Sequence, residues 1–182
     1  DFIVCTYPPL RQTKSFSWAA LSFTVVAVLF LISNHANGDV ITVGDVDPNV
    51  SDAGVVGGPD LIIGNTGVGG LFMDIAPPLS GPLQALASDT GVIGNQGNSI
   101  GAAVFDDFGV RWEIANSLTV GNLGQGFLDV FESALIQVGG PLPSTAPTII
   151  GEGLTGQGIV RLEGIASRLT TGPLTVGDEG VG

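Results

Sequence analysis

Glycines at near-constant intervals constrain the fold of this chain more than any other feature of its sequence. Five similar segments each carry an apolar residue, a glycine (the pivot glycine), a short polar stretch and a second glycine (the closing glycine). Successive pivots are 30, 27, 30 and 26 residues apart, at Gly64, Gly94, Gly121, Gly151 and Gly177. Repeats of roughly 20 to 50 residues are typical of solenoids and propellers, in which each copy packs on its neighbours.

Two lengths of turn alternate along the repeats. The closing glycine follows its pivot by five residues in the first, third and fifth copies, and by seven in the second and fourth. These closing glycines are Gly69, Gly101, Gly126, Gly158 and Gly182. Because glycine adopts positive φ without strain, equivalent corners can stack at the pivots. The alternation indicates a built-in repeat rather than chance glycine richness.

Within each copy the apolar period is two residues, which is the period of a β-strand. The second and fourth positions after the closing glycine are predicted to face a core; they are Leu71 and Met73, Ala103 and Phe105, Leu128 and Val130, and Val160 and Leu162. No long helical period occurs after Asp39. The predicted fold is therefore all-β, a parallel β-solenoid over residues 61–182.

Asparagine follows three of the pivot glycines, at Asn65, Asn95 and Asn122. Asparagine tolerates left-handed backbone, and its amide can both donate and accept hydrogen bonds. If the corners stack, we expect these three side chains to form a row of amide hydrogen bonds, as in other stacked β-structures.

Residues 1–38 have the composition of an export signal. Two basic residues precede the apolar run Phe16–Ser33, and the small residues Ala36 and Gly38 follow it. This order is typical of a cleavable signal peptide, so we expect a signal helix and cleavage after Gly38. The alternative is an uncleaved anchor, in which case membrane contact would occur only through residues 16–33. Both interpretations place the remainder outside the cytoplasm.

Residues 39–60 are interpreted as a cap strand and loop, which a solenoid needs at its end. The loop raises a calcium hypothesis, because oxygen-bearing side chains alternate at Asp45, Asp47 and Asn49. An EF-hand loop needs glycine at its sixth position and glutamate at its twelfth. Here those positions hold Val50 and Val56, so a solvated turn is favoured over a calcium site.

The part of the chain after residue 38 is strongly acidic and lacks several of the residue types that bind metals or act in catalysis. It holds three arginines against sixteen Asp and Glu, a net charge of 3 − 16 = −13, and it contains no Cys, His, Lys or Tyr. Nucleic-acid binding is excluded, because it requires clustered basic residues. Thiolate and imidazole metal sites are excluded as well, and no disulfide can hold this part together.

Candidate sites for catalysis are few. Asp106–Asp107 is an adjacent carboxylate pair, and paired carboxylates can hydrolyse glycosides. Neighbouring strand residues point to opposite faces, however, and no His or Lys is present to assist, so a solvated turn is favoured. Gly67–Gly70 lacks the lysine and helix of a phosphate loop. Trp112 is predicted to fill the core rather than stack on a sugar. We assign no catalytic, cofactor-binding or metal residue.

The repeat resembles those associated with autotransporters (type V secretion) and with PEP-CTERM-sorted exported bacterial proteins. The resemblance is carried by Thr90–Gln137 and Leu174–Gly182, extends more loosely over Leu61–Gly182, and includes the opening Asp39–Pro48. It implies a right-handed parallel β-helix displayed at or beyond the cell surface, with no defined catalytic residues. Such proteins carry a C-terminal sorting segment or translocator barrel, which is not found here.

The functional expectation is a non-catalytic exported scaffold, the stalk or passenger segment of a cell-surface or adhesin-like protein. The sequence names no partner; a cell-surface polysaccharide or protein is the kind that such a segment would meet. The alternative is a carbohydrate-active β-helix enzyme with its catalytic part beyond residue 182. The chain ends inside a repeat, so we expect it to be a fragment. Stiffening of acidic turns by calcium is a third idea, although the spacing of RTX repeats is absent.

Overall fold

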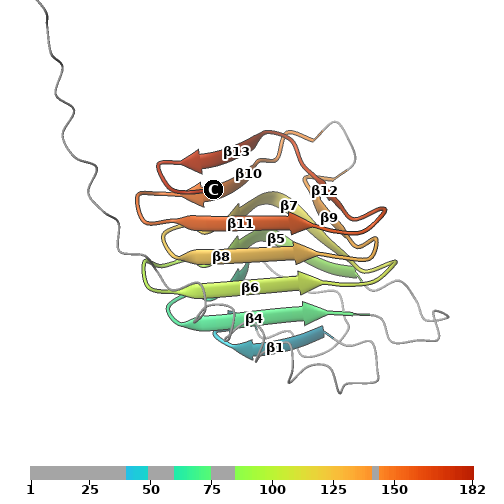
Figure 1. Cartoon of the computed structure of the whole chain (residues 1–182), viewed down its shortest axis with the longest axis horizontal. Helices are drawn as coiled ribbons and strands as arrows, with labels where there is room; N and C mark the ends of the chain where they lie inside the picture. Colours follow the sequence, from blue (N-terminus) through green and yellow to red (C-terminus); the bar gives the residue numbers. More distant parts are fainter. Residues whose placement is uncertain (1–39, 49–59, 75–84, 141–143) are drawn as a thin grey trace, which may run out of the picture.

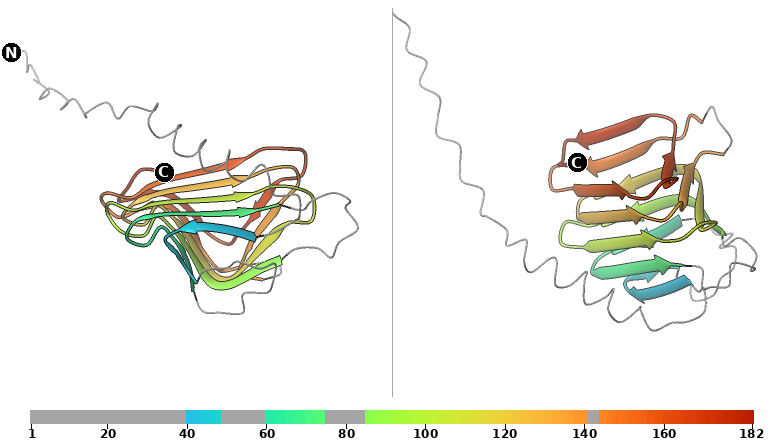
Figure 2. Two further views of the ribbon diagram at one scale, coloured as in Figure 1. Left: turned by 90° about the horizontal axis from the view of Figure 1, so that it is seen from below. Right: turned by 45° about the vertical axis from the view of Figure 1, so that its right-hand side comes forward.

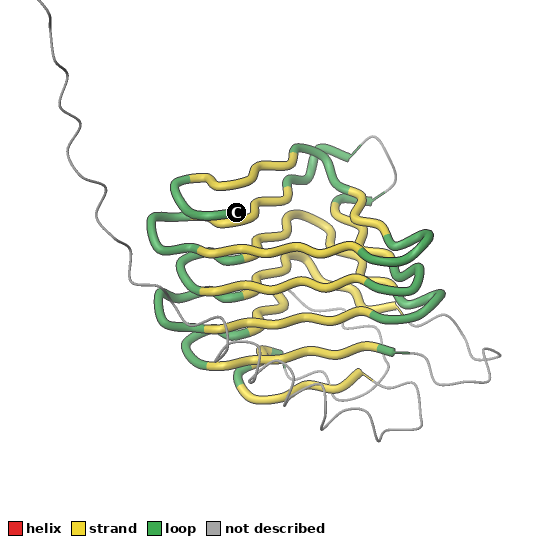
Figure 3. The backbone as a smooth tube through the Cα atoms, viewed as in Figure 1, coloured by secondary structure: helices red, strands yellow, loops and turns green. Residues whose placement is uncertain are grey.

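The structure is a computed structural model that describes residues 40–48, 60–74, 85–140 and 144–182. All regular elements in these residues are β-strands (Figures 1 and 3). The signal-peptide helix expected in residues 1–38 lies outside the described residues. The strands are β1 (Val40–Gly44), β2 (Val46–Asp47), β3 (Asp60–Ile63), β4 (Val68–Met73), β5 (Ala85–Ile93), β6 (Ile100–Phe105), β7 (Arg111–Val120), β8 (Gln125–Val130), β9 (Leu135–Val138), β10 (Thr148–Glu152), β11 (Gln157–Leu162), β12 (Arg168–Thr170) and β13 (Leu174–Asp178).

The chain coils into a β-solenoid of about four turns, which confirms the predicted fold class. Sheet A is formed in the order β1-β4-β6-β8-β11, and sheet B in the order β12-β9-β7-β5-β3-β2. In sheet B, β10 also pairs with β7, and β13 pairs with β10. All pairings among strands β3 to β13 are parallel. Consecutive turns therefore lie one above the other, as Figure 1 shows.

Each turn has three straight segments, and the coil has a roughly triangular outline when viewed down the stack (Figure 2, left). One segment belongs to sheet A and two belong to sheet B. In β5 and β7 the two sheet B segments form one long strand whose register shifts between Ser88 and Thr90. In the later turns they are separate strands, β9 and β10, then β12 and β13.

The pivot glycines stack at one corner of the triangle, as the spacing predicts. The residues before them pair in the order Ile63, Ile93, Val120, Ile150 and Val176. Every pivot has a φ between +71° and +75°. The corner therefore uses the left-handed backbone that glycine adopts without strain.

The closing glycines also pair in register, from Gly69 through Gly101 and Gly126 to Gly158. Their φ values are not positive, so conformational freedom is not the reason for glycine here. At Gly126 an added Cβ would lie 2.3 Å from the Gly121 nitrogen and 2.4 Å from the Ile93 oxygen. Those two atoms form the hydrogen bond, 2.7 Å long, that ties one pivot to the previous turn. Each closing glycine packs its bare Cα against such a pivot.

The core is a set of columns that run up the inside of the coil. Of the eight inward positions predicted in sheet A, six are 2% exposed or less: Leu71, Met73, Ala103, Phe105, Leu128 and Val130. Val160 is partly buried against them. The prediction for Leu162 is wrong, because this side chain is 47% exposed. Its column ends there, since β11 is the last strand of sheet A.

Trp112 is fully buried, as predicted, and is among the largest core side chains. Its ring stacks on Phe105 with the centroids 5.5 Å apart. The Trp112 Nε1 donates a 3.0 Å hydrogen bond to the Ser88 hydroxyl. Gly91 makes room for the indole, because a Cβ at Gly91 would lie 2.6 Å from Trp112 Cζ2.

The N-terminal end of the coil is covered by antiparallel strands. Strand β1 pairs with β4, and Val40 at its start is 2% exposed. The sequence suggested only a loop after Gly44, whereas Val46–Asp47 forms β2 and pairs antiparallel with β3. Reversed strand direction means that β1 and β2 do not continue the parallel coil.

Candidate functional site

Polar side chains outside the core gather at two corners of the coil and on the outer face of sheet A. At the pivot corner the asparagine row forms as expected. Asn95 Nδ2 donates to Asn65 Oδ1, and Asn122 Nδ2 donates to Asn95 Oδ1, each at 2.8 Å. The row ends at Glu152, which follows the next pivot and has no amide to offer. This arrangement ties three turns together.

Replacing Asn95 with alanine is expected to lower the free energy of unfolding by about 1–2 kcal/mol, because two side-chain hydrogen bonds are lost. Chemical denaturation followed by circular dichroism measures this change. Asn98 lies exposed in the same corner, so Asn98→Ala is the matched control and should stay within about 0.5 kcal/mol of the parent. Equal effects at the two positions would contradict a structural role for the row.

Asp45 anchors the first corner from the N-terminal cap. Its Oδ2 accepts hydrogen bonds from the backbone N–H groups of Thr66 and Gly67 at 2.6 and 2.7 Å. These hydrogen bonds hold the pKa of Asp45 below its ordinary value. In the next corner the corresponding backbone donors reach the preceding turn, for example from Gln96 N to Asn65 O. The first corner has no complete turn beneath it, so the Asp45 carboxylate supplies the acceptor that a backbone oxygen of the preceding turn supplies in the next corner.

This contact bears on two patterns in the sequence. In the calcium hypothesis Asp45 was one of three ligands, and its carboxylate oxygen is occupied by backbone donors. Asn49 lies outside the described residues. The glycine-rich run Gly67–Gly70 enters β4, and its first N–H binds this carboxylate.

The carboxylate pair Asp106–Asp107 lies in the loop between β6 and β7, at another corner of the coil. Burial raises the pKa of Asp106 above its ordinary value, and the charges of Asp107 and Glu132 add to the effect, while the Asp107 N–H opposes it. The Oδ1 atom of Asp106 is buried without a hydrogen-bond partner. Asp107 has a φ of +90°, which is strained for a residue with a side chain. The loop therefore holds the Asp106 proton more tightly than an exposed aspartate would.

Replacing Asp106 with asparagine is expected to stabilise the fold at pH 7, because it removes a partly buried charge. The folded protein holds the Asp106 proton more tightly than the unfolded chain, so this group opposes folding above its raised pKa. The advantage of Asp106→Asn should therefore shrink as the pH falls towards 4. Melting temperatures of both proteins between pH 4 and pH 7 test this, and a pH-independent difference would contradict it.

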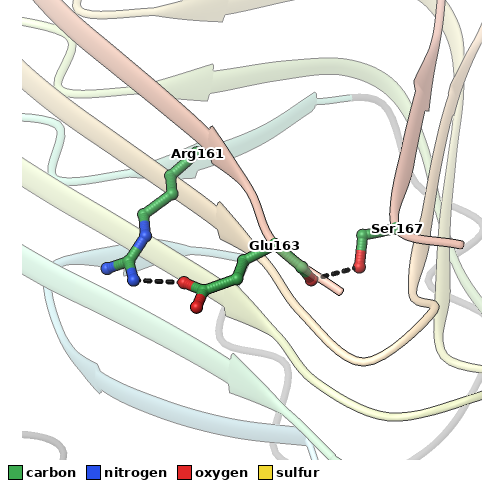
Figure 4. A network of polar contacts seen from close by, with 3 residues as sticks. All are labelled: Arg161, Glu163 and Ser167. Atoms are coloured by element: carbon green, nitrogen blue, oxygen red, sulfur yellow. Dashed lines mark hydrogen bonds and ion pairs between the residues drawn. The ribbon is translucent and has the colours of Figure 1, made fainter. Parts of the chain in front are cut away.

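A second charged cluster lies at the end of β11 (Figure 4). Arg161 forms an ion pair with Glu163 and lies 5.2 Å from the centre of the Phe131 ring. It is the register partner of Asp129 on β8. Burial raises the pKa of Asp129, while the positive charge of Arg161 opposes that shift. The Ser167 hydroxyl donates to the Glu163 backbone oxygen, which holds the following loop.

The sequence reasoning did not single out Asp129 and Arg161. Both residues are the third after a closing glycine, Gly126 and Gly158. Because closing glycines pair in register, residues at the same distance after them lie side by side. Comparing the third position after each closing glycine would therefore have predicted that Asp129 and Arg161 lie together. The clusters at Asp106 and at Arg161 differ in composition, since only the second contains a cation.

The described residues contain no group of three or more His, Cys, Asp or Glu side chains placed to hold a metal ion. Within the same residues, no helix is long and apolar enough to cross a bilayer. Comparisons with protein-family models, curated proteins and solved structures gave no match.

Proposed function

We propose that this protein is a non-catalytic exported scaffold, the stalk or passenger segment of a cell-surface or adhesin-like protein. The observation that carries the proposal is the column structure of the coil, in which five corners are stacked and one core continues from turn to turn until the last, where it becomes exposed. Such a coil grows by adding turns, because each turn is stabilised chiefly by its neighbours. This is a suitable design for spacing or display.

Chemistry and charge support the same proposal. After residue 38 the chain has no Cys, His or Lys, and its three arginines face sixteen carboxylates. Two of these arginines pair with glutamates, Arg111 with Glu113 and Arg161 with Glu163. A surface of this charge favours solubility and remains hydrated outside the cell. The apolar run Phe16–Ser33 would direct export, in the manner of the autotransporter and PEP-CTERM repeats that the sequence resembles.

Export is tested with the full chain in a bacterial host. Mass spectrometry of the protein outside the cytoplasm should show a new N-terminus at Asp39. The matched control is Ala36→Arg, which places a large charged residue before the cleavage site and should leave the precursor uncut. Full-length protein found only in the cytoplasm would contradict the export part of the proposal.

One observation favours a second candidate function, a carbohydrate-active β-helix enzyme that uses a carboxyl group within this chain in addition to a catalytic part beyond residue 182. A carboxyl group with a raised pKa, such as Asp106, is a property of general acids in glycoside hydrolysis. Incubation with neutral and acidic polysaccharides distinguishes the two functions. The scaffold proposal expects no release of reducing ends. Release that Asp106→Asn abolishes would support the enzyme and overturn the scaffold.

A further inference from the structure

The two ends of the coil are built differently. At the N-terminal end, antiparallel β1 and β2 cover β4 and β3. At the other end, β11 pairs only with β8, β12 only with β9, and β13 only with β10, counting the strands of the described residues. We term this second end the open end. After Gly158, whose N–H donates to the Val181 oxygen, the outer edge of β11 meets no further strand of the described residues, and β12 and β13 each leave one edge without a strand partner there.

The open end also exposes the side chains that every other turn buries. Leu162, Leu174 and Val176 are 47%, 54% and 58% exposed. Each continues a column whose earlier members are buried, as Val176 does after Ile63, Ile93 and Val120. Val160 and Leu169 are only partly buried. Apolar side chains that belong to the core columns are therefore exposed together at the open end, which marks an interaction surface.

Val181 and Gly182 show which partner fits this face. Val181 N donates to Gly156 O at 2.9 Å, which repeats the bond from Gln157 N to Gly124 O one turn earlier. Val181 is also the parallel bridge partner of Gln157. At Gly182 an added Cβ would lie 2.6 Å from Ile150 O and 2.8 Å from Gly177 N, the same pair of contacts as at Gly126. Gly182 thus occupies the position of a closing glycine.

We infer that the open end is a docking face for one more parallel turn of the same pattern, entering directly from Gly182. The occupant begins with a strand that has apolar residues at the second and fourth positions after this glycine. Those side chains would cover Val160 and Leu162, and the strand backbone would pair with the free edge of β11. Main-chain pairing combined with alternate apolar contacts is the chemistry of β-strand addition.

Charge argues against a second copy as the occupant. Glu152 and Asp178 are register partners at the open end, and Glu179 forms a bridge to Glu152. Two open ends placed face to face would bring together two surfaces that each carry these carboxylates, and like charges repel. A turn that follows Gly182 would not bring a second set of these carboxylates to the open end. The inference does not rest on the proposed function, because it depends only on strand register and exposure.

The test extends the full chain after Gly182 with a copy of residues 127–150, which follow the equivalent Gly126. The extended protein should bind the apolar dye ANS several-fold less than the parent and melt about 5 °C higher or more. Hydrogen exchange at β11 should slow as its free edge becomes paired. The matched control carries the same added residues with the first moved to the end, which turns the strand faces over and should reproduce none of these changes.

Equal behaviour of the two extensions, or no change with either, would overturn the inference. Sedimentation of the unextended chain tests the other occupant. A concentration-dependent dimer that Leu162→Asp dissolves would show that a second copy fills the face, and it would also overturn the inference. A monomer at all concentrations, combined with a response specific to register, supports it. Neither result bears on export or on polysaccharide cleavage, so this proposal and the proposed function fail separately.

Discussion

Gly126→Ala is expected to lower the free energy of unfolding by about 3 kcal/mol or more, the upper end of the cost of overpacking. The new Cβ would lie 2.3 Å from the Gly121 nitrogen and 2.4 Å from the Ile93 oxygen. Both are backbone atoms, and they are joined by the hydrogen bond from the pivot Gly121 to the previous turn, so no side-chain rotation relieves the contact. Thermal denaturation followed by circular dichroism should show a melting temperature about 10 °C lower.

Gly97→Ala is the matched control for this prediction. Gly97 lies in the neighbouring corner, its φ is not positive, and an added Cβ would meet no atom closer than 3.9 Å. Alanine also restricts the unfolded chain, so this variant should match the parent or gain about 0.4–1 kcal/mol. If both variants lose stability equally, the contact at the pivot hydrogen bond is not what requires glycine at position 126.

The sequence could predict the pivots because left-handed backbone at a sharp corner leaves glycine as the favoured residue. The positions of the closing glycines followed from their spacing, but their physical reason did not. At Gly101 and Gly126 the requirement is close approach to the hydrogen bond that the pivot of the same copy donates to the previous turn, with Ile63 O or Ile93 O as the acceptor. That contact exists only after the turns have stacked. The repeat thus predicted which glycines pair, whereas the stacked turns supply the physical reason for glycine at the closing positions.

The remaining differences have the same origin. Asp45 resembled a calcium ligand because local spacing says nothing of the Thr66 and Gly67 donors that its carboxylate meets. Leu162 fits the alternating apolar pattern and is nevertheless exposed. The burial of each inward side chain depends on the following turn as well as on the turn to which the residue belongs. The charged side chains Asp129 and Arg161 lie together through strand register, which a search for apolar positions ignores.

Trp112→Ala is expected to have the largest effect of any core truncation, a loss of about 3–5 kcal/mol. The side chain is fully buried, stacks on Phe105 and donates to Ser88. Alanine leaves a cavity in the middle of the coil and a buried hydroxyl without its donor, and each adds to the cost. Chemical denaturation followed by circular dichroism measures the loss. Leu154→Ala is the control, since Leu154 is 84% exposed and should change stability by less than about 0.5 kcal/mol.

The pairing of Trp112 with Gly91 makes the prediction more specific than a general loss of core volume. Gly91→Ala alone should cost about 1–3 kcal/mol, because its Cβ would lie 2.6 and 2.7 Å from Cζ2 and Cη2 of the indole. In the Trp112→Ala background these two contacts no longer exist, and the nearest remaining atom is Leu118 Cδ1 at 3.1 Å. Most of the cost of Gly91→Ala should therefore disappear there, giving a coupling energy of about 1 kcal/mol or more. Strictly additive losses would mean that Gly91 is required by the backbone of β5 and not by the indole packed over it.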